Sequence, residues 1–370
     1  MEKSELGFLL ALLRFPKFGP VRLAKLRGFF SSMEATFKAD SGQLIMSGLE
    51  PKIVEQFIAN RNVLSPEKEL ALLEKHRIKA ITFSDDNYPA LLKKIYDPPA
   101  VLFVRGQLPE ADSLMLAVVG SRKESNYGAR AVKNLIEPLA ASKIVIVSGL
   151  AYGIDALAHQ AALNVGGKTL AVLGSSVDDE NIFPIENRRL AFEIIKASGA
   201  IVSEFPVGSP IMKQNFPIRN RVIAGLCHGT LVIEAAKTSG ALITARAALE
   251  DGREVFAVPG PIDSENSEGT NQIIKTGAHV VTEPNDILSV LNLSTYTSVF
   301  TSPSPPGRGV RGEGGSPEET ELLSLLSNEP IHIDDLVRTT GKKISEISHV
   351  LTLMEMKGSA RHIGGLYYTL

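Results

Sequence analysis

The sequence has a single cysteine, no long apolar run and no excess of positive charge. Cys227 alone excludes an internal disulfide and a zinc site built from several cysteines. Hydrophobic residues make up 44% of the chain, yet no run approaches the ~18 apolar residues that a membrane span needs. The short apolar stretch at the start is flanked by Glu2 and Glu5 and precedes no small-residue cleavage site, so we expect an amphipathic helix rather than a signal peptide. These absences favour a soluble cytoplasmic protein of two or three domains.

Two common nucleotide-binding motifs are also absent. No Gly-Lys-Ser/Thr sequence of the Walker type occurs, so ATP hydrolysis has no support. The segment from Gly149 to Gly153 lacks the Gly-x-Gly-x-x-Gly spacing of nicotinamide-binding proteins. We therefore expect no cofactor, no metal and no catalytic residue.

The charge balance argues against bulk electrostatic binding of duplex DNA. The net charge is -2, with 16 basic against 18 acidic residues in 114–292 and 5 against 8 in 317–370. Neither segment has the basic character that non-specific duplex binding usually requires. Any nucleic-acid binding must come from a local pocket, with the acidic residues on other faces.

The chain does contain a series of short apolar runs that end in glycine, serine, proline or a charged residue. They lie at 114–122, 144–147, 169–173, 200–203, 229–234, 254–258 and 279–281. Runs without polar alternation are typical of strands buried on both faces, and helical segments such as 128–140 and 155–163 lie between them. The pattern predicts an α/β fold with a Rossmann-like, doubly wound, mostly parallel sheet.

Several of these strand ends carry groups that bind anions. Gly120, Ser121 and Arg122 follow the first strand, Ser148 and Gly149 follow the second, and Ser239 and Gly240 open a later helix. Strand carboxyl ends and helix N-termini place N–H donors around an anion, and a guanidinium grips phosphate through two hydrogen bonds. We expect Arg122 to contact a phosphate; the alternative is an ion pair with a nearby carboxylate.

The segment between Pro210 and Pro217 and the residues after it add cations and an aromatic ring. The candidate binding residues here are Lys213, Phe216, Arg219, Asn220 and Arg221. A base stacks on an exposed aromatic ring while a cation holds the backbone, which suits single strands. Burial of Phe216 in the core is the alternative, and one of the two arginines is open to a structural role.

Three further side chains raise the question of catalysis. Asp155 and His159 stand four residues apart on one helix face, a spacing compatible with acid–base chemistry. Helix capping and packing explain the pair better, and Glu234 at a strand end is more typical of a fold-stabilising carboxylate.

We expect a sheet domain at 84–294 with three flanking segments, at 1–83, 295–317 and 318–370. Residues 1–83 are helical, and Gly19-Pro20 between two apolar helices resembles a helix-hairpin-helix or SAM-like domain; its five basic residues in 6–33 either contact DNA or form a solvated face. In the bridge that follows, 84–89 is expected to start a helix and 101–104 to be an edge strand. Residues 295–317 are rich in Ser, Pro and Gly and predict a flexible linker.

The last segment, 318–370, predicts a winged helix. Three helices, at 318–327, 333–340 and 344–357, precede a hairpin through Gly364-Gly365. Only Lys342-Lys343 before the third helix suits phosphates, so protein contact or support of a dimer is favoured over duplex reading.

The ordered set of motifs resembles one known family, the DNA-processing protein A (DprA/Smf) family, over roughly 85–291. The motifs are Gly120-Ser121-Arg122, Ser148-Gly149 with Ala151, Gly153-Ile154-Asp155, Ser203-Glu204-Phe205-Pro206, Phe216-Pro217 with Arg219-Asn220-Arg221, Ser239-Gly240 and Ala257-Val258-Pro259-Gly260. The resemblance implies a non-enzymatic protein that binds single-stranded DNA in natural transformation, protects it and helps to load the RecA recombinase. From the shallow pocket we also expect a homodimer formed mainly through 114–292.

One alternative class remains, the Rossmann-like phosphoribohydrolases that resemble lysine-decarboxylase-like proteins. Those enzymes use a Pro-Gly-Gly-x-Gly-Thr loop and a catalytic glutamate. The nearest stretch here, Thr238-Ser239-Gly240-Ala241, lacks that loop.

Overall fold

The structure, a computed structural model, describes residues 1–291, 317–326, 331–342, 344–356, 360–364 and 367–369. The chain divides into two compact units, residues 1–301 and 302–370, which are treated separately below. The expected linker falls outside the described residues except for Pro317, the first residue of a helix. No helix in the described segments is long and apolar enough to cross a membrane.

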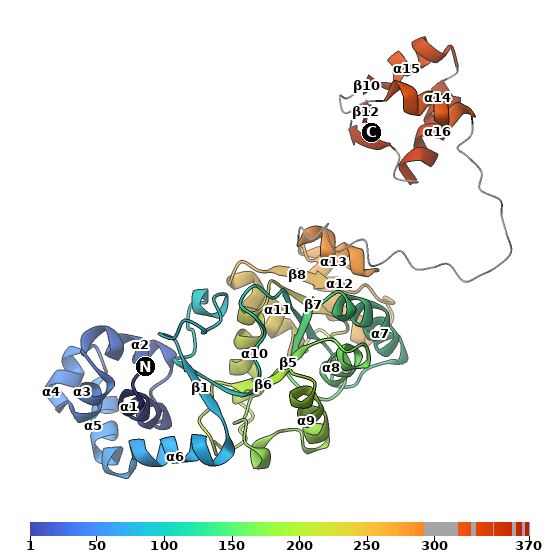
Figure 1. The fold of residues 1–370 in the computed structure, drawn as a ribbon. Coiled ribbons are helices and arrows are strands. Elements are labelled where there is room, and N and C mark those ends of the chain that lie inside the picture. Colours follow the sequence, from blue (N-terminus) through green and yellow to red (C-terminus); the bar gives the residue numbers. More distant parts are fainter. Residues whose placement is uncertain (292–316, 327–330, 343, 357–359, 365–366, 370) are drawn as a thin grey trace. The chain divides into compact units, whose positions relative to one another are not determined.

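The first unit is built around a nine-stranded sheet (Figure 1), in the order β1-β2-β6-β5-β4-β3-β7-β8-β9. The strands are β1 (Lys79–Thr82), β2 (Val101–Gly106), β3 (Met115–Val119), β4 (Val145–Ser148), β5 (Thr169–Val172), β6 (Ala200–Ser203), β7 (Gly229–Val232), β8 (Glu254–Ala257) and β9 (His279–Val280). Across the sheet, each neighbouring pair from β6 through β5, β4, β3, β7 and β8 to β9 is parallel. Strand β2 runs antiparallel to both β1 and β6. The predicted Rossmann-like, mostly parallel sheet is confirmed.

Both faces of the parallel strands β3 to β7 are buried, which explains their unbroken apolar sequences. Along β3, Leu116 and Val118 face a core shared with α7 (Asn126–Ala141) and α8 (Ile154–Asn164). The alternating residues Ala117 and Val119 face α10 (Asn215–Leu226) and α11 (Ala241–Glu250) on the other side. The remaining α-helices of this region are α9 (Arg188–Lys196), α12 (Glu265–Lys275) and α13 (Pro284–Val290), and two short 3-10 helices, η3 (Asp179–Asn181) and η4 (Ile185–Asn187), precede α9.

The bridge before the parallel strands differs from its prediction. The strand expected at an edge, β2, lies inside the sheet because β1 pairs with its outer side. The expected helix at 84–89 is a turn, in which Asp85 Oδ2 accepts a hydrogen bond from the N–H of Thr82 at 2.7 Å. Only a short 3-10 helix, η2 (Leu92–Lys94), follows it. An Asp side chain that bonds nearby backbone favours a turn over a helix.

Six helices precede the sheet: α1 (Lys3–Arg14), α2 (Pro20–Phe29), α3 (Met33–Lys38), α4 (Ser41–Met46), α5 (Pro51–Asn60) and α6 (Pro66–His76). A short 3-10 helix, η1 (Arg61–Val63), follows α5. Helix α3 has only six residues and is capped by Ser32, whose side chain accepts from the N–H of Ala35.

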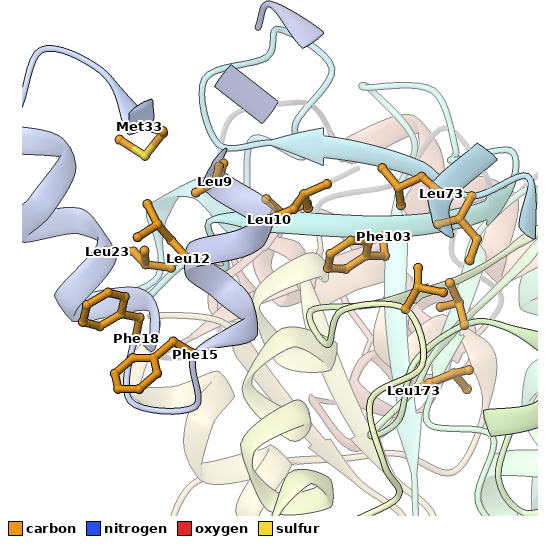
Figure 2. Close-up of a cluster of buried hydrophobic side chains, with 14 of the residues drawn as sticks. Leu9, Leu10, Leu12, Phe15, Phe18, Leu23, Met33, Leu73, Phe103 and Leu173 are labelled. Carbon is orange, nitrogen blue, oxygen red and sulfur yellow. The ribbon is translucent and has the colours of Figure 1, made fainter. Parts of the chain in front are cut away.

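The helical segment and the sheet share one hydrophobic core. Leu10 and Leu73 from the helices belong to the same buried cluster as Phe103 of β2 and Leu173 after β5, as Figure 2 shows. Residues 1–83 and 84–294 were expected as separate domains. In the structure they form parts of a single unit, and β1 belongs to the sheet.

The second unit contains the elements of the predicted winged helix. They are α14 (Pro317–Leu325), β10 (Ile331–His332), α15 (Ile333–Thr340), α16 (Ile344–Met356), β11 (Arg361–Gly364) and β12 (Tyr367–Thr369). The last two strands pair antiparallel as the expected hairpin, and Leu336, Ile347 and Leu351 lie in the core. Lys342 pairs with Glu321 at 2.7 Å, and Lys343 lies outside the described residues.

Candidate nucleic-acid interface

A pocket lies where the chain changes direction in the sheet. From β3 the chain runs through β4 and β5 to β6, then returns to the other side of β3 with β7. At such a point the loops after the two central strands diverge, and their carboxyl ends leave a crevice in which α/β folds bind ligands. The crevice has a volume of about 610 Å³ and is lined by the segments after β3 and β7 and by the first turns of α10, α11 and α12. We call it the sheet-end pocket.

Close packing fixes the loop after β3. A Cβ on Gly120 would lie 2.6 Å from the Ile154 side chain, so only glycine allows this contact with α8. Gly153 has a φ of +74°, and a Cβ there would lie 2.3 Å from the carbonyl oxygen of Ser121. The Ser121 hydroxyl donates to the carbonyl of Lys123 at 2.9 Å and accepts from the N–H of Lys123 at 3.1 Å. These contacts hold the loop in one shape.

This loop presents two cations at the pocket. Arg122 and Lys123 both line it and both are exposed. Neither has an ion-pair partner among the residues that the structure describes, so the ion pair considered for Arg122 is not found. Its guanidinium carbon lies 5.8 Å from the centroid of the Phe216 ring.

Phe216 lies partly exposed on the first turn of α10. It lines the pocket, and its ring centroid is 5.7 Å from that of Phe183. A Cβ on Gly174 would come within 2.7 Å of the ring. The ring therefore packs against the protein on one side and remains accessible on the other. This placement is intermediate between the two sequence interpretations, an exposed ring for base stacking and a ring buried in the core.

Arg219 also lines the sheet-end pocket, but the fold holds its side chain in place. Its side chain is buried and donates to the carbonyl of Gly149 at 2.7 Å and to the carbonyl of Val172. Burial lowers the pKa of Arg219 to about 10, while the charge of Asp155 opposes that shift. Asp155 in turn accepts from the N–H of Gly149 at 3.1 Å. Arg219 is held by the protein and has little freedom to grip a ligand phosphate.

Arg221 is also engaged in the fold. It pairs with Glu204 and, at 3.2 Å, with Asp97, and it donates to the carbonyl of Asp97 at 2.8 Å. It does not line the sheet-end pocket. From the sequence, either Arg219 or Arg221 was open to a structural role. In the structure both side chains bond to other parts of the fold.

Three other candidates are not placed as the sequence suggested. The Ser148 hydroxyl is fully buried and donates to the carbonyl of Val118 at 2.6 Å, because β4 lies beside β3. Gly149 lies under Arg219, whose guanidinium would be 2.5 Å from a Cβ, and is not in the pocket lining. Lys213 is exposed but also lies outside the lining.

The opposite wall is formed by α10 and the start of α11. Asn220, Ser239 and Gly240 all line the pocket, and the Asn220 amide donates to the carbonyl of Gly240 at 3.2 Å. Asn266 of α12 also lines it and donates to the carbonyl of Lys123 at 3.0 Å. Sequence reasoning missed Lys123 and Asn266. The adjacency of Lys123 to Arg122 was an available signal, whereas Asn266, far along the chain, had none.

Glu234 and His159, considered above for catalysis, hydrogen-bond to other residues of the fold. Glu234 accepts from the N–H of Ser125 at 3.0 Å, and Ser125 caps α7. His159 is fully buried against the Thr169 hydroxyl at 2.6 Å, and burial lowers its pKa to about 3. Neither residue lines the sheet-end pocket. The pocket therefore offers cations, an aromatic ring and amides, and its carboxylates are Asp155 and Glu265.

Comparison with known proteins assigns this architecture to a family. Residues 79–292 match the family described as DNA recombination-mediator protein A, and residues 302–365 match the DprA winged helix domain. The chain belongs to the DNA-processing protein A family. The Smf protein of Escherichia coli K12 is 39% identical over 338 residues, which cover 90% of this chain and 87% of the relative. DNA processing protein DprA of Streptococcus pneumoniae is 44% identical over 216 residues, covering 58% and 75% of the two chains.

Solved structures of the family share the fold. The X-ray structure of DprA from Streptococcus pneumoniae has a TM-score of 0.65 at 35% identity, covering 76% of this chain and 97% of that one. DNA processing protein A from Helicobacter pylori, studied for its single-stranded DNA binding mode, has a TM-score of 0.52 at 27% identity. It covers 59% and 97% of the two chains. The family predicted from the sequence motifs is confirmed.

Proposed function

We propose that this protein binds single-stranded DNA in the sheet-end pocket. The observation that carries the proposal is that Arg122 lies beside the accessible ring of Phe216, with Lys123 in the same lining, and that neither cation has an ion-pair partner in the described part of the chain. A cation beside an aromatic ring serves the two repeating parts of a single strand, because the phosphate takes the charge and the base takes the ring. The single-stranded DNA binding described for the Helicobacter pylori relative supports this choice of ligand.

The proposed contacts follow from the geometry of the lining. Arg122 holds a phosphate through its guanidinium, and Phe216 stacks against a base. Gly120, Ser121, Asn220, Ser239 and Gly240 form the walls together with Arg219, which donates to the carbonyl of Gly149. A pocket of this size at the ends of strands admits one flexible backbone and excludes a rigid duplex.

Family membership supports three finer proposals. The protein protects incoming DNA in natural transformation, helps to load the RecA recombinase, and acts as a homodimer without enzymatic activity. One pocket grips only a few nucleotides, so two linked pockets would raise each other's effective concentration on a long strand. RecA loading is checked by whether the protein speeds RecA filament formation on single strands already covered by a single-strand-binding protein.

The decisive experiment compares ligands directly. We expect fluorescence polarisation to show clear preference for labelled oligo-dT over a blunt duplex at physiological salt, with little sequence selectivity. Equal binding to both would contradict the pocket and favour the α1–α2 turn or the winged helix as the binding element. A parallel incubation with nucleoside monophosphates detects base release, which the phosphoribohydrolase alternative requires and our proposal does not allow.

A further inference from the structure

The first turn of α10 separates the sheet-end pocket from a second groove. Pro217 lines the pocket, and the next residue, Ile218, lines the groove. The groove has a volume of about 380 Å³ and lies between the α1–α2 turn and the segment from β6 to α10. Much of its lining is apolar, with Pro16, Phe205 and Met212 as members. Pro217 and Ile218 are exposed, so the ridge between the two depressions is open to solvent.

A third depression continues the groove along α2. The two share Gly19 and Pro20, where the α1–α2 turn enters the helix. The third depression has a volume of about 350 Å³, and Lys25 lines it. The sheet-end pocket, the groove and this depression therefore follow one another across the surface of the first unit.

Three lysines that form no ion pair with any described residue accompany this path. Lys25 lines the far end of the path. Lys17 and Lys213 do not line the groove themselves, but each is flanked in the sequence by two lining residues, in the α1–α2 turn and before α10 respectively. All three are exposed, and the structure records no ion pair for any of them within the described residues. Lys213, which the sequence suggested for the first pocket, is instead flanked in the chain by two groove-lining residues.

The acidic side chains close to the groove and the third depression are paired with arginines. Glu69 pairs with Arg14 of the groove lining at 2.6 Å, and Glu50 pairs with Arg22 at 3.0 Å. Glu204 also lines the groove, but it is buried and paired with Arg221. The free charge along the groove and the third depression is therefore positive, although the chain as a whole carries -2.

We propose that a single strand held in the sheet-end pocket continues over the first turn of α10 and through the groove to α2. Its phosphates lie on Lys213, Lys17 and Lys25, and its bases contact the apolar lining. An apolar trough edged by cations suits an unstacked strand. This inference rests on the proposed function and adds a second set of contacts that only a longer strand reaches.

The test compares two lengths of labelled oligo-dT, ~6 and ~20 nucleotides. A single-strand site of one domain spans ~4–16 nucleotides, so the short oligonucleotide fits one site and the long one exceeds it. The variant carries Lys17→Ala and Lys25→Ala together. We expect unchanged affinity for the short oligonucleotide and weaker binding of the long one. The log–log salt slope of the long oligonucleotide should fall by about 1.4, for two lost phosphate contacts at ~0.7 each.

A charge-matched control uses two other exposed lysines of the helical segment, Lys52→Ala with Lys75→Ala, which line neither depression. This control variant should leave the affinities for the short and the long oligonucleotide unchanged. Unchanged binding of the long oligonucleotide by the first variant, equal weakening of both lengths, or equal weakening by the control would overturn the proposed path. Arg122→Ala in the same assay tests the sheet-end pocket separately, because that change should weaken the short oligonucleotide as well.

Discussion

The Arg122 guanidinium carbon lies 5.8 Å from the centroid of the Phe216 ring, and both side chains line the sheet-end pocket. The two come from different elements, the loop after β3 and the first turn of α10. Their proximity therefore depends on the doubly wound topology, which brings α10 back across the carboxyl end of β3. A phosphate on the guanidinium and a base on the ring are the two contacts that the account requires.

Replacing Phe216 tests the stacking contact. Phe216→Leu keeps apolar volume against Phe183 but removes the flat ring, so we expect oligo-dT affinity to fall by ~1–3 kcal/mol. An oligonucleotide of the same length without bases is the control, because it keeps the phosphates. If the variant weakens both oligonucleotides equally, Phe216 does not stack with a base.

Replacing Arg219 should affect folding more than binding chemistry. Arg219→Ala leaves two buried carbonyls and the nearby Asp155 carboxylate without their donor or counter-charge. We expect the free energy of unfolding in urea to fall by about 3–5 kcal/mol. Arg122→Ala, at an exposed position, should change it by less than ~0.5 kcal/mol. Equal stabilities for the two variants would show that Arg219 has no structural role.

The Glu204 carboxyl should make stability depend on pH. Burial, with the nearby Asp97, raises its pKa to about 7 against the opposing effect of Arg221, whereas the ordinary value is 4.5. The folded state thus keeps a proton that the unfolded chain has lost. The resulting stabilisation is complete below pH 4.5 and disappears as the pH rises to about 7.

Glu204→Gln removes this titration. Between pH 4.5 and 7, the unfolding free energy of the wild type should decline relative to that of the variant, by at most about 3 kcal/mol. Because all other carboxyls titrate in both proteins, the difference between them isolates Glu204. A difference that stays constant with pH would contradict the raised pKa.

Removing residues 295–370 tests where binding and assembly lie. We expect the shortened protein to remain a homodimer and to bind oligo-dT with little loss, because the proposed pocket and the proposed interface lie within 114–292. Light scattering and polarisation measure the two properties. A folded monomer would place the dimer interface in the removed segment.

The parallel strands could be predicted because their burial on both faces leaves unbroken apolar runs in the sequence. The position of β2 inside the sheet could not be predicted, because the sequence of a strand of four to six residues does not reveal which strand pairs with its outer side. Likewise, Leu10 and Phe103 are far apart in the chain, and nothing local shows that they share one core.

The same distinction between local sequence and tertiary packing applies to the residues of the candidate site. Gly120, Ser121 and Arg122 could be located at a strand end from sequence order alone. The burial of Arg219 and Ser148 depends on which carbonyls the neighbouring strands present, namely those of Val172 and Val118. Lys213 was grouped with Phe216 because it is close in sequence, yet the first turn of α10 separates its neighbours from the pocket.

The salt dependence of oligo-dT binding by Arg122→Ala tests the central claim most directly. Lys168→Ala is the control, because Lys168 is exposed and precedes β5 at the opposite, amino end of the strands. We predict that Arg122→Ala weakens binding and lowers the log–log salt slope by about 0.7, the value for one phosphate contact with a single strand. Lys168→Ala should match the wild type. A folded Arg122→Ala protein with the affinity and slope of the wild type would contradict the account.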